Sequence, residues 1–86
     1  KLALKRYAEG IEDYKVAAAM DPNSRGLAYY NITCGYSCLN EVDKAIESLQ
    51  KAVDAGWYDP KYLNTDTDLE NIRNDERFKA ILNKQL

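Results

Sequence analysis

The sequence predicts an all-α fold: an antiparallel helical hairpin with one helix before it and a short helical segment after it. Apolar residues recur at steps of three and four residues along most of the chain, a spacing that gathers side chains on one face of a helix. This spacing is interrupted at Pro22, Asn40 and Gly56, residue types that end helices or turn the chain. Ala45 and Ala52 share one helical face, and such small residues let two helix backbones approach closely.

The first helix is predicted over Lys1–Met20. Its apolar stripe consists of Leu4, Tyr7, Ile11, Tyr14, Ala17 and Ala18. Gly10 interrupts the stripe and weakens the helix by about 1 kcal/mol relative to alanine. Asp21 precedes Pro22, and a residue before proline disfavours the helical conformation, so the first helix is expected to end here.

The two helices of the hairpin are predicted over Gly26–Leu39 and Asp43–Ala55. Asn40 tolerates the left-handed backbone that ends a helix, and Gly56 is expected to do the same for the second helix. The apolar faces are formed by Tyr29, Ile32, Thr33 and Tyr36 in one helix and by Val42, Ala45, Ile46, Leu49, Ala52 and Val53 in the other.

The last part of the chain is predicted to be short helices joined by turns. Pro60 stands at a plausible helix start with Asp59 before it as a cap. Residues 64–68 form a turn rich in capping side chains, and one helical turn follows at residues 69–72. A final helix opens at Asn74-Asp75. Its apolar face is formed by Phe78, Ile81 and Leu82.

Length and charge restrict the classes of partner. Eighty-six residues make a single domain, 1–86, and a chain of this size buries only about 60% of its unfolded surface. The net charge of −2 and the lack of a basic cluster argue against nucleic acid or an anionic membrane as the main partner. No long apolar run or signal peptide stands out, and the chain begins at Lys1, as a fragment or processed product does.

Cys34 and Cys38 lie one turn apart on a predicted helix. They could be a redox pair or half of a metal site. The chain has no histidine and no further cysteine, so four zinc ligands of these types cannot come from one chain. We therefore favour two reduced, weakly apolar side chains on a helix face. Free thiols favour a reducing compartment, so the expected location is cytoplasmic.

Other motifs predict no catalytic residue, cofactor or metal. Asp66, Asp68 and Glu70 alternate as calcium ligands do, but Asn71 and Arg77 stand where an EF-hand loop needs glycine and an acid. Caps and turns explain these acids instead. There is no histidine, no nucleophile elbow and no glycine-rich phosphate loop, so we expect a domain that is not an enzyme.

The order of aromatic, aliphatic and small residues in the hairpin resembles a tetratricopeptide repeat (TPR), a helix-turn-helix unit of 34 residues. The matching positions are Tyr29, Ile32, Tyr36, Ala45 and Ala52. Thr33 and Leu49 depart from the usual residues, and Trp57 occupies the place of the proline that ends a repeat. The resemblance implies the end of a TPR array: residues 1–22 as half of a preceding repeat, 26–57 as a complete repeat, and 58–86 as the closing segment.

The resemblance also implies that the first helix of the hairpin lines a groove for a partner peptide. The candidate groove residues are Leu27, Tyr30, Asn31, Cys34, Ser37 and Cys38. Tyr30 and Cys34 occupy two places that a carboxylate-binding groove of this family gives to charged or amide side chains, so such a clamp is not expected. In the alternative interpretation, this stripe packs on a neighbouring helix of the same chain. Four other tyrosines, Tyr7, Tyr14, Tyr29 and Tyr36, lie on predicted core stripes, and Tyr30 does not.

The expected function is therefore a non-catalytic protein–protein interaction module that presents a helical surface to a peptide or helix of a partner protein. Two alternatives remain open. The apolar face of the first helix, around Leu4, could pair with a second copy of the chain in a homodimer. The domain could also be the regulatory tail of a larger multidomain protein.

Overall fold

The computed structural model describes residues 2–84, with the side chains described from residue 6 onward. Every regular element in this part of the chain is a helix, so the predicted all-α fold is confirmed. The α-helices are α1 (Leu2–Met20), α2 (Arg25–Cys38), α3 (Val42–Asp54), α4 (Pro60–Thr65), α5 (Glu70–Arg73) and α6 (Glu76–Lys84). Two 3-10 turns, η1 (Pro22–Ser24) and η2 (Thr67–Leu69), precede α2 and α5.

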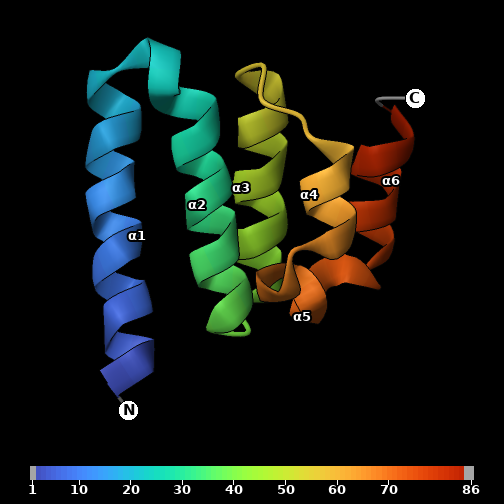
Figure 1. Cartoon of the computed structure of the whole chain (residues 1–86), viewed down its shortest axis with the longest axis horizontal. Coiled ribbons are helices and arrows are strands. Elements are labelled where there is room, and N and C mark those ends of the chain that lie inside the picture. The colour runs from blue at the N-terminus through green and yellow to red at the C-terminus, as the bar shows by residue number, and fades with distance from the viewer. Residues whose placement is uncertain (1, 85–86) are drawn as a thin grey trace.

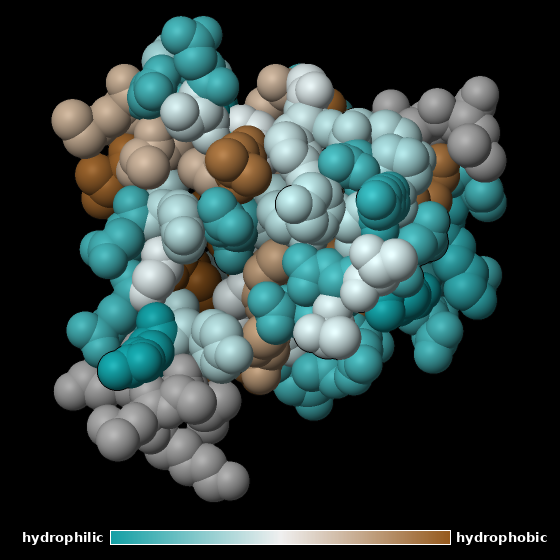
Figure 2. Space-filling view, in the orientation of Figure 1, coloured by the Kyte–Doolittle hydropathy of each residue, from teal (hydrophilic) through white to brown (hydrophobic). Residues whose placement is uncertain are grey.

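The helices lie side by side in a flat arrangement (Figure 1). From left to right in that view stand α1, α2, α3, α4 and α6, with α5 below. The molecule measures 36 × 29 × 19 Å, so its shortest dimension is little more than the thickness of one or two helices. Figure 2 shows that the visible face is mostly polar, with apolar atoms gathered where α1 ends and α2 begins.

The main core lies between α3 and the C-terminal segment. Ala45, Leu49 and Ala52 of α3 are fully buried. The buried side chains that pack with them from the C-terminal segment are Leu63, Leu69, Ile72, Phe78 and Ile81. The C-terminal segment, α4 to α6 with η2, thus supplies half of the buried residues of this core.

The predicted turns form as their residue types suggest. Asn40 has a φ of 60°, and the amides of Asn40 and Glu41 donate to Ser37 and Tyr36 at the end of α2. Gly56 has a φ of 98° and ends α3. Asp59 accepts from the amides of Lys61 and Tyr62 at the start of α4, as the sequence predicts.

Two glycines mark places where backbones approach closely. A Cβ atom on Gly35 would lie 2.7 Å from Cγ1 of Ile11, so the absence of a side chain lets α1 pack on α2. A Cβ atom on Gly26 would lie 2.6 Å from Cβ of Trp57 and 3.2 Å from its backbone nitrogen. Both glycines therefore sit at close contacts of α2, one with each of its neighbouring segments.

The predicted stripe of α1 divides into a buried and a half-open part. Ile11 and Ala18 are buried, whereas Tyr7 and Tyr14 keep 37% and 41% of their surface exposed. The side chain of Leu4, predicted in the same stripe, lies outside the described residues. Arg25 ties the end of the helix to α2, because its Nε donates to the carbonyl of Ala18 at 2.8 Å.

Candidate functional site

The six predicted groove residues lie in three different environments. Tyr30 and Ser37 are buried, Asn31, Cys34 and Cys38 are half-buried, and Leu27 is 53% exposed. This surface faces the C-terminal segment over part of its length. Within the described residues, the stripe is therefore not a continuous solvent-exposed surface, and much of it forms an internal contact.

Tyr30 makes the strongest of these internal contacts. Its ring stacks on Trp57, with centroids 4.2 Å apart and planes at 23°, and Tyr62 lies beside it at 6.4 Å. Its hydroxyl donates to Asp66 Oδ2. Burial raises the pKa of Tyr30, and the hydrogen bond to Asp66 raises it further. The sequence placed Tyr30 outside the core, so this prediction is wrong: Tyr30 is the most buried of the tyrosines named above, at 6% exposed.

The two thiols lie against the same segment. Cys34 Sγ donates to Asp66 Oδ2 at 3.8 Å, and Cys38 Sγ donates to the carbonyl of Asp68 at 4.0 Å. Burial raises the pKa of Cys34 to about 12, and burial also raises the pKa of Cys38. Both cysteines are free. At neutral pH they are therefore thiols rather than the thiolates that nucleophilic or metal-binding chemistry requires.

One group of potential metal ligands occurs among residues 2–84. Donor atoms of Cys34, Asp66 and Asp68 lie within 4.8 Å of one another. Asp66 already accepts from Tyr30, from Cys34 and from the amide of Asp68, so both of its oxygens already accept hydrogen bonds. The hydrogen bonds and the cap at η2 account for this group without an ion, and its one sulfur ligand is held protonated by burial, which raises the pKa of that thiol.

Asn71 and Arg73 fasten the C-terminal segment to this face. Asn71 Nδ2 donates to the carbonyl of Ser37 at 2.7 Å. Arg73 donates to the carbonyls of Leu63 and Asp66. The Ser37 hydroxyl is buried without a hydrogen-bond partner in the described part of the chain. Nothing in the sequence indicated these hydrogen bonds. The first joins residues 34 positions apart, and the two bonds of Arg73 depend on how the loop before α5 folds back.

A cavity of about 330 Å³ lies between α1 and α2, beside η2. We call it the α1–α2 groove; it is lined by Arg6, Tyr7, Gly10, Ile11, Tyr14, Asn31, Cys34, Gly35 and Asp68. Two of the predicted groove residues, Asn31 and Cys34, belong to it. The Asn31 amide makes no side-chain hydrogen bond to any described residue, so its donors and its acceptor are available to a ligand.

Sequence reasoning missed the wall that α1 contributes. Tyr7, Gly10 and Tyr14 follow one another at steps of three and four residues and so share a helical face. A glycine between two tyrosines leaves room between the rings, because a Cβ atom on Gly10 would meet nothing within 4 Å. The spacing of these residues could have indicated the wall, but Tyr7 and Tyr14 were predicted to lie in the core.

No helix in the described part of the chain is long and apolar enough to cross a membrane. No solved structure matches the chain. Among known proteins, it is similar to a protein of Arabidopsis thaliana that is described by name as chloroplastic, with 32% identity over 79 residues. The match covers 90% of this chain and 24% of the relative, so the chain spans about a quarter of that protein's length. The relative's name places that protein in the chloroplast, and the expected cytoplasmic location is not confirmed.

Residues 12–85 match the family described as "A/B hydrolase-like, N-terminal domain". The predicted membership of the TPR family is therefore wrong, and so is the interpretation of residues 58–86 as the closing segment of a TPR array. The resemblance rested on helix-packing positions such as Ile32, Ala45 and Ala52, which are buried here. Small and large residues alternate in this way wherever two helices pack closely, so they do not distinguish families. The chain belongs to the family of A/B hydrolase-like N-terminal domains.

Proposed function

We propose that this domain is a non-catalytic protein-binding module that receives an extended peptide segment of a partner protein in the α1–α2 groove. The observation that carries this proposal is the composition of the groove. Two half-exposed aromatic rings, Tyr7 and Tyr14, stand on one wall. The amide of Asn31, which has no hydrogen-bond partner among the described side chains, stands on the other.

These groups suit a peptide chain. Tyrosine rings offer a large contact area at a low cost in side-chain entropy, since only two torsions must be fixed. An asparagine amide can donate to a peptide carbonyl and accept from a peptide N–H at the same time. Arg6 and Asp68 add one charge of each sign to the lining, which would fix the direction of a bound segment by pairing with its charged side chains.

The residue types that most often carry out catalysis are either missing from the chain or not activated, which favours a non-catalytic role. The chain contains no histidine. The raised pKa values of Cys34 and Cys38 keep both thiols protonated near neutral pH, and an unactivated thiol is a weak nucleophile. We propose that any hydrolase activity of a longer protein containing this domain resides outside it. The domain would then act as a regulatory or substrate-positioning part of that protein.

A peptide display experiment on the 86-residue chain tests the groove. Peptides would be selected from a random library, and their affinities measured by calorimetry for wild type, Tyr14→Ala and Asn31→Ala. Each substitution should weaken binding at least tenfold, because each removes one wall of the site. Leu27→Ala is the matched control: it removes an exposed apolar side chain outside the groove, and the affinity should stay unchanged.

A second variant tests the same site by filling it. Gly10→Gln places a side chain into the groove without a clash, because a Cβ atom there meets nothing within 4 Å. This variant should fold and lose peptide binding. Selected peptides that bind wild type, Gly10→Gln and Asn31→Ala equally well would place the binding surface elsewhere and disprove the proposal. Tyr30→Ala is unsuitable as a probe, since it would remove the ring that stacks on Trp57.

Self-association is a second candidate, favoured by the exposed apolar side chains at one end of α1 and α2. Val16, Met20 and Leu27 are 58%, 78% and 53% exposed. Light scattering after size exclusion, over a range of concentrations, separates the two candidates. A dimer that Met20→Asp converts to a monomer would support pairing through this end. A monomer at all concentrations would exclude it.

A further inference from the structure

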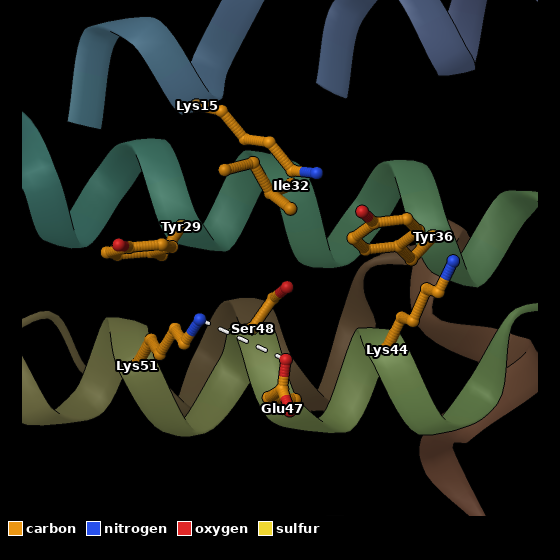
Figure 3. A pocket seen from close by; sticks show the side chains of 8 residues that line it. All are labelled: Lys15, Tyr29, Ile32, Tyr36, Lys44, Glu47, Ser48 and Lys51. Atoms are coloured by element: carbon orange, nitrogen blue, oxygen red, sulfur yellow. Dashed lines mark ion pairs between the residues drawn. The ribbon is translucent and has the colours of Figure 1, made fainter. Parts of the chain in front are cut away.

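A second pocket, of about 410 Å³, lies where α1, α2 and α3 meet (Figure 3). We call it the lysine pocket; it is lined by Lys15, Tyr29, Ile32, Tyr36, Lys44, Glu47, Ser48 and Lys51. None of these residues lines the α1–α2 groove, so the two sites occupy different faces of α2. Its volume falls in the range of sites for small molecules, which is about 300–1,000 Å³.

Three lysine side chains from two helices line the pocket, two at one end and one at the other. Nζ of Lys15 and Nζ of Lys44 lie 5.7 and 5.8 Å from the ring centroid of Tyr36. Nζ of Lys51 lies 5.7 Å from the ring centroid of Tyr29. These distances are typical of cation–π interactions, and such interactions keep the flexible lysine side chains near the pocket. The proximity of the Tyr36 hydroxyl also raises the pKa of Lys15.

Lysines outnumber acidic residues in the lining of the pocket, although the chain as a whole is acidic. The chain has a net charge of −2, whereas three lysines and one glutamate line this pocket. The lysines have acidic partners nearby in the sequence, with N–O distances of 3.4 Å to Glu12, 3.6 Å to Glu41 and 3.9 Å to Glu47. Ion pairs between exposed side chains are weak, so a doubly charged ligand can displace these acids from the lysines.

The floor of the pocket is neutral and closed. Ile32 is 1% exposed and Ser48 is 7% exposed. In Figure 3 the Ser48 hydroxyl points from α3 toward the space between the lysines. It has no side-chain hydrogen-bond partner in the described part of the chain, so it can donate to a ligand oxygen. The floor thus adds one hydrogen-bond donor, the Ser48 hydroxyl, to the three flexible ammonium groups.

We propose that the lysine pocket binds a phosphorylated small molecule, with a phosphate group that contacts Lys15 and Lys44 beside the Tyr36 ring. Ammonium groups are compact point charges that reach a tetrahedral dianion from several directions. A phosphate monoester carries a charge of about −1.5 to −2 at neutral pH, whereas a carboxylate carries a single charge. Two ammonium groups at one end of the pocket, those of Lys15 and Lys44, therefore suit a phosphate.

The spacing of the charges adds a second requirement. Lys44 and Lys51 are seven residues apart on α3, which is about 10 Å along a helix. Tyr29 and Tyr36 have the same spacing on α2, so each end of the pocket pairs one ring with an ammonium group. A ligand with two phosphates about 10 Å apart meets both ends. It should bind more tightly than a ligand with one phosphate.

A titration followed by NMR amide shifts tests the proposal on the 86-residue chain. The probes are a hexose 6-phosphate and a hexose 1,6-bisphosphate. Both should shift amides of α2 and α3 around the pocket, and the bisphosphate should bind at least tenfold more tightly. Affinity should rise from about pH 5.5 to about pH 7.5, because a phosphate monoester loses its second proton near pH 6 while the lysines stay charged.

Two double variants of equal charge separate the pocket from general electrostatics. Lys15→Gln with Lys44→Gln should weaken bisphosphate binding at least tenfold. Lys61→Gln with Lys79→Gln removes two exposed lysines outside the pocket and should leave affinity unchanged. Circular dichroism would check that both variants are folded. The absence of saturable shifts, or an equal loss in both variants, would overturn the proposal. Tighter binding of an oligoglutamate peptide than of the bisphosphate would also overturn it.

Discussion

At the residue scale, two glycines have opposite effects on stability: Gly10 weakens helix α1, whereas Gly35 allows α1 and α2 to pack closely. Gly10 lies in α1, where an added Cβ atom would meet nothing within 4 Å, and Gly35 lies in α2 against Ile11. We expect Gly10→Ala to raise the free energy of unfolding by about 0.5–1 kcal/mol, because alanine favours the helix. For a chain of this length, the melting temperature should rise by several degrees.

Gly35→Ala is the opposite case. Its Cβ atom would lie 2.7 Å from Cγ1 of the buried Ile11, so the Ile11 side chain or α1 itself must shift. We expect the free energy of unfolding to fall by about 1–3 kcal/mol, as overpacking of a close contact does. Urea unfolding measures both variants. A gain in stability from Gly35→Ala would mean that α1 does not pack closely on α2.

The environment of Cys34 predicts slow chemical modification. Its pKa of about 12 lies well above that of a free thiol, and each pKa unit lowers the thiolate fraction tenfold at pH 8. Cys34 should react with iodoacetamide at least a hundredfold more slowly than an unfolded cysteine. Mass spectrometry of partly modified chains measures the rate. Reaction of Cys34 at the rate found in urea would contradict its burial.

The same raised pKa links stability to alkaline pH. The contribution of the buried thiol is complete below the unfolded pKa of about 8.5 and is lost as pH rises toward the folded value. The sequence allowed the prediction that the cysteines stay reduced on a helix face. It did not reveal the carboxylate of Asp66 beside Cys34, because that residue is 32 positions away along the chain.

At the scale of elements, Arg77 connects the start of α6 to the start of α3. Its guanidinium lies 2.8 Å from Asp43 Oδ1 and 2.9 Å from Asp75 Oδ2. Asp75 also accepts from the amide of Arg77 at 2.8 Å, as a cap of α6. The side-chain hydrogen bond with Arg77 lowers the pKa of Asp75. One arginine therefore bridges two helices through an acid that also begins one of them.

This arrangement predicts a pH dependence. A lowered folded pKa gives stability that is present above the unfolded value of about 3.9 and is lost as pH falls through the folded value. Asp75→Asn should therefore lower the melting temperature at neutral pH, and its difference from wild type should vanish in strong acid, near about pH 2. Glu76→Gln, at an 88% exposed side chain, is the control and should have little effect.

The elements themselves could largely be predicted, because their signals are local. The three long helices, the left-handed Asn40 and the cap at Asp59 each depend on neighbours within about four residues. The burial of Tyr30 could not be predicted in this way. It requires Trp57 beside the ring and Asp66 beside the hydroxyl, and the latter is 36 positions away.

At the scale of the whole molecule, stability should differ between its two sides. α3 lies between α2 and the C-terminal helices, whereas α1 stands at one edge and packs mainly on α2 (Figure 1). Amide hydrogen exchange should be slowest in α3 and fastest, among the long helices, in α1. Gly10→Ala should slow exchange in α1 alone. Equal protection of α1 and α3 would show that the chain opens only as a unit.

The candidate sites also follow from the arrangement of the whole. The α1–α2 groove needs Tyr7 and Tyr14 of α1, which sequence spacing assigned to a core stripe. The lysine pocket needs Lys15 of the same helix, which sequence spacing left out of that stripe. Spacing along a helix shows which residues share a face, but not whether that face is covered. The side chains of Tyr7 and Tyr14 on this face of α1 are partly exposed to solvent. Among the described residues of this flat molecule, no further helix lies beyond α1 to cover them.

The edge position of α1 has a mechanical consequence. A force applied to the two ends of the chain would act first on the helix that is held on one side. The 19 residues of α1 rise about 1.5 Å each when helical and about 3.4 Å when extended, so its release would lengthen the chain by roughly 35 Å. In an optical trap, this step should come at low force and should reverse, before the main rupture of the core around α3.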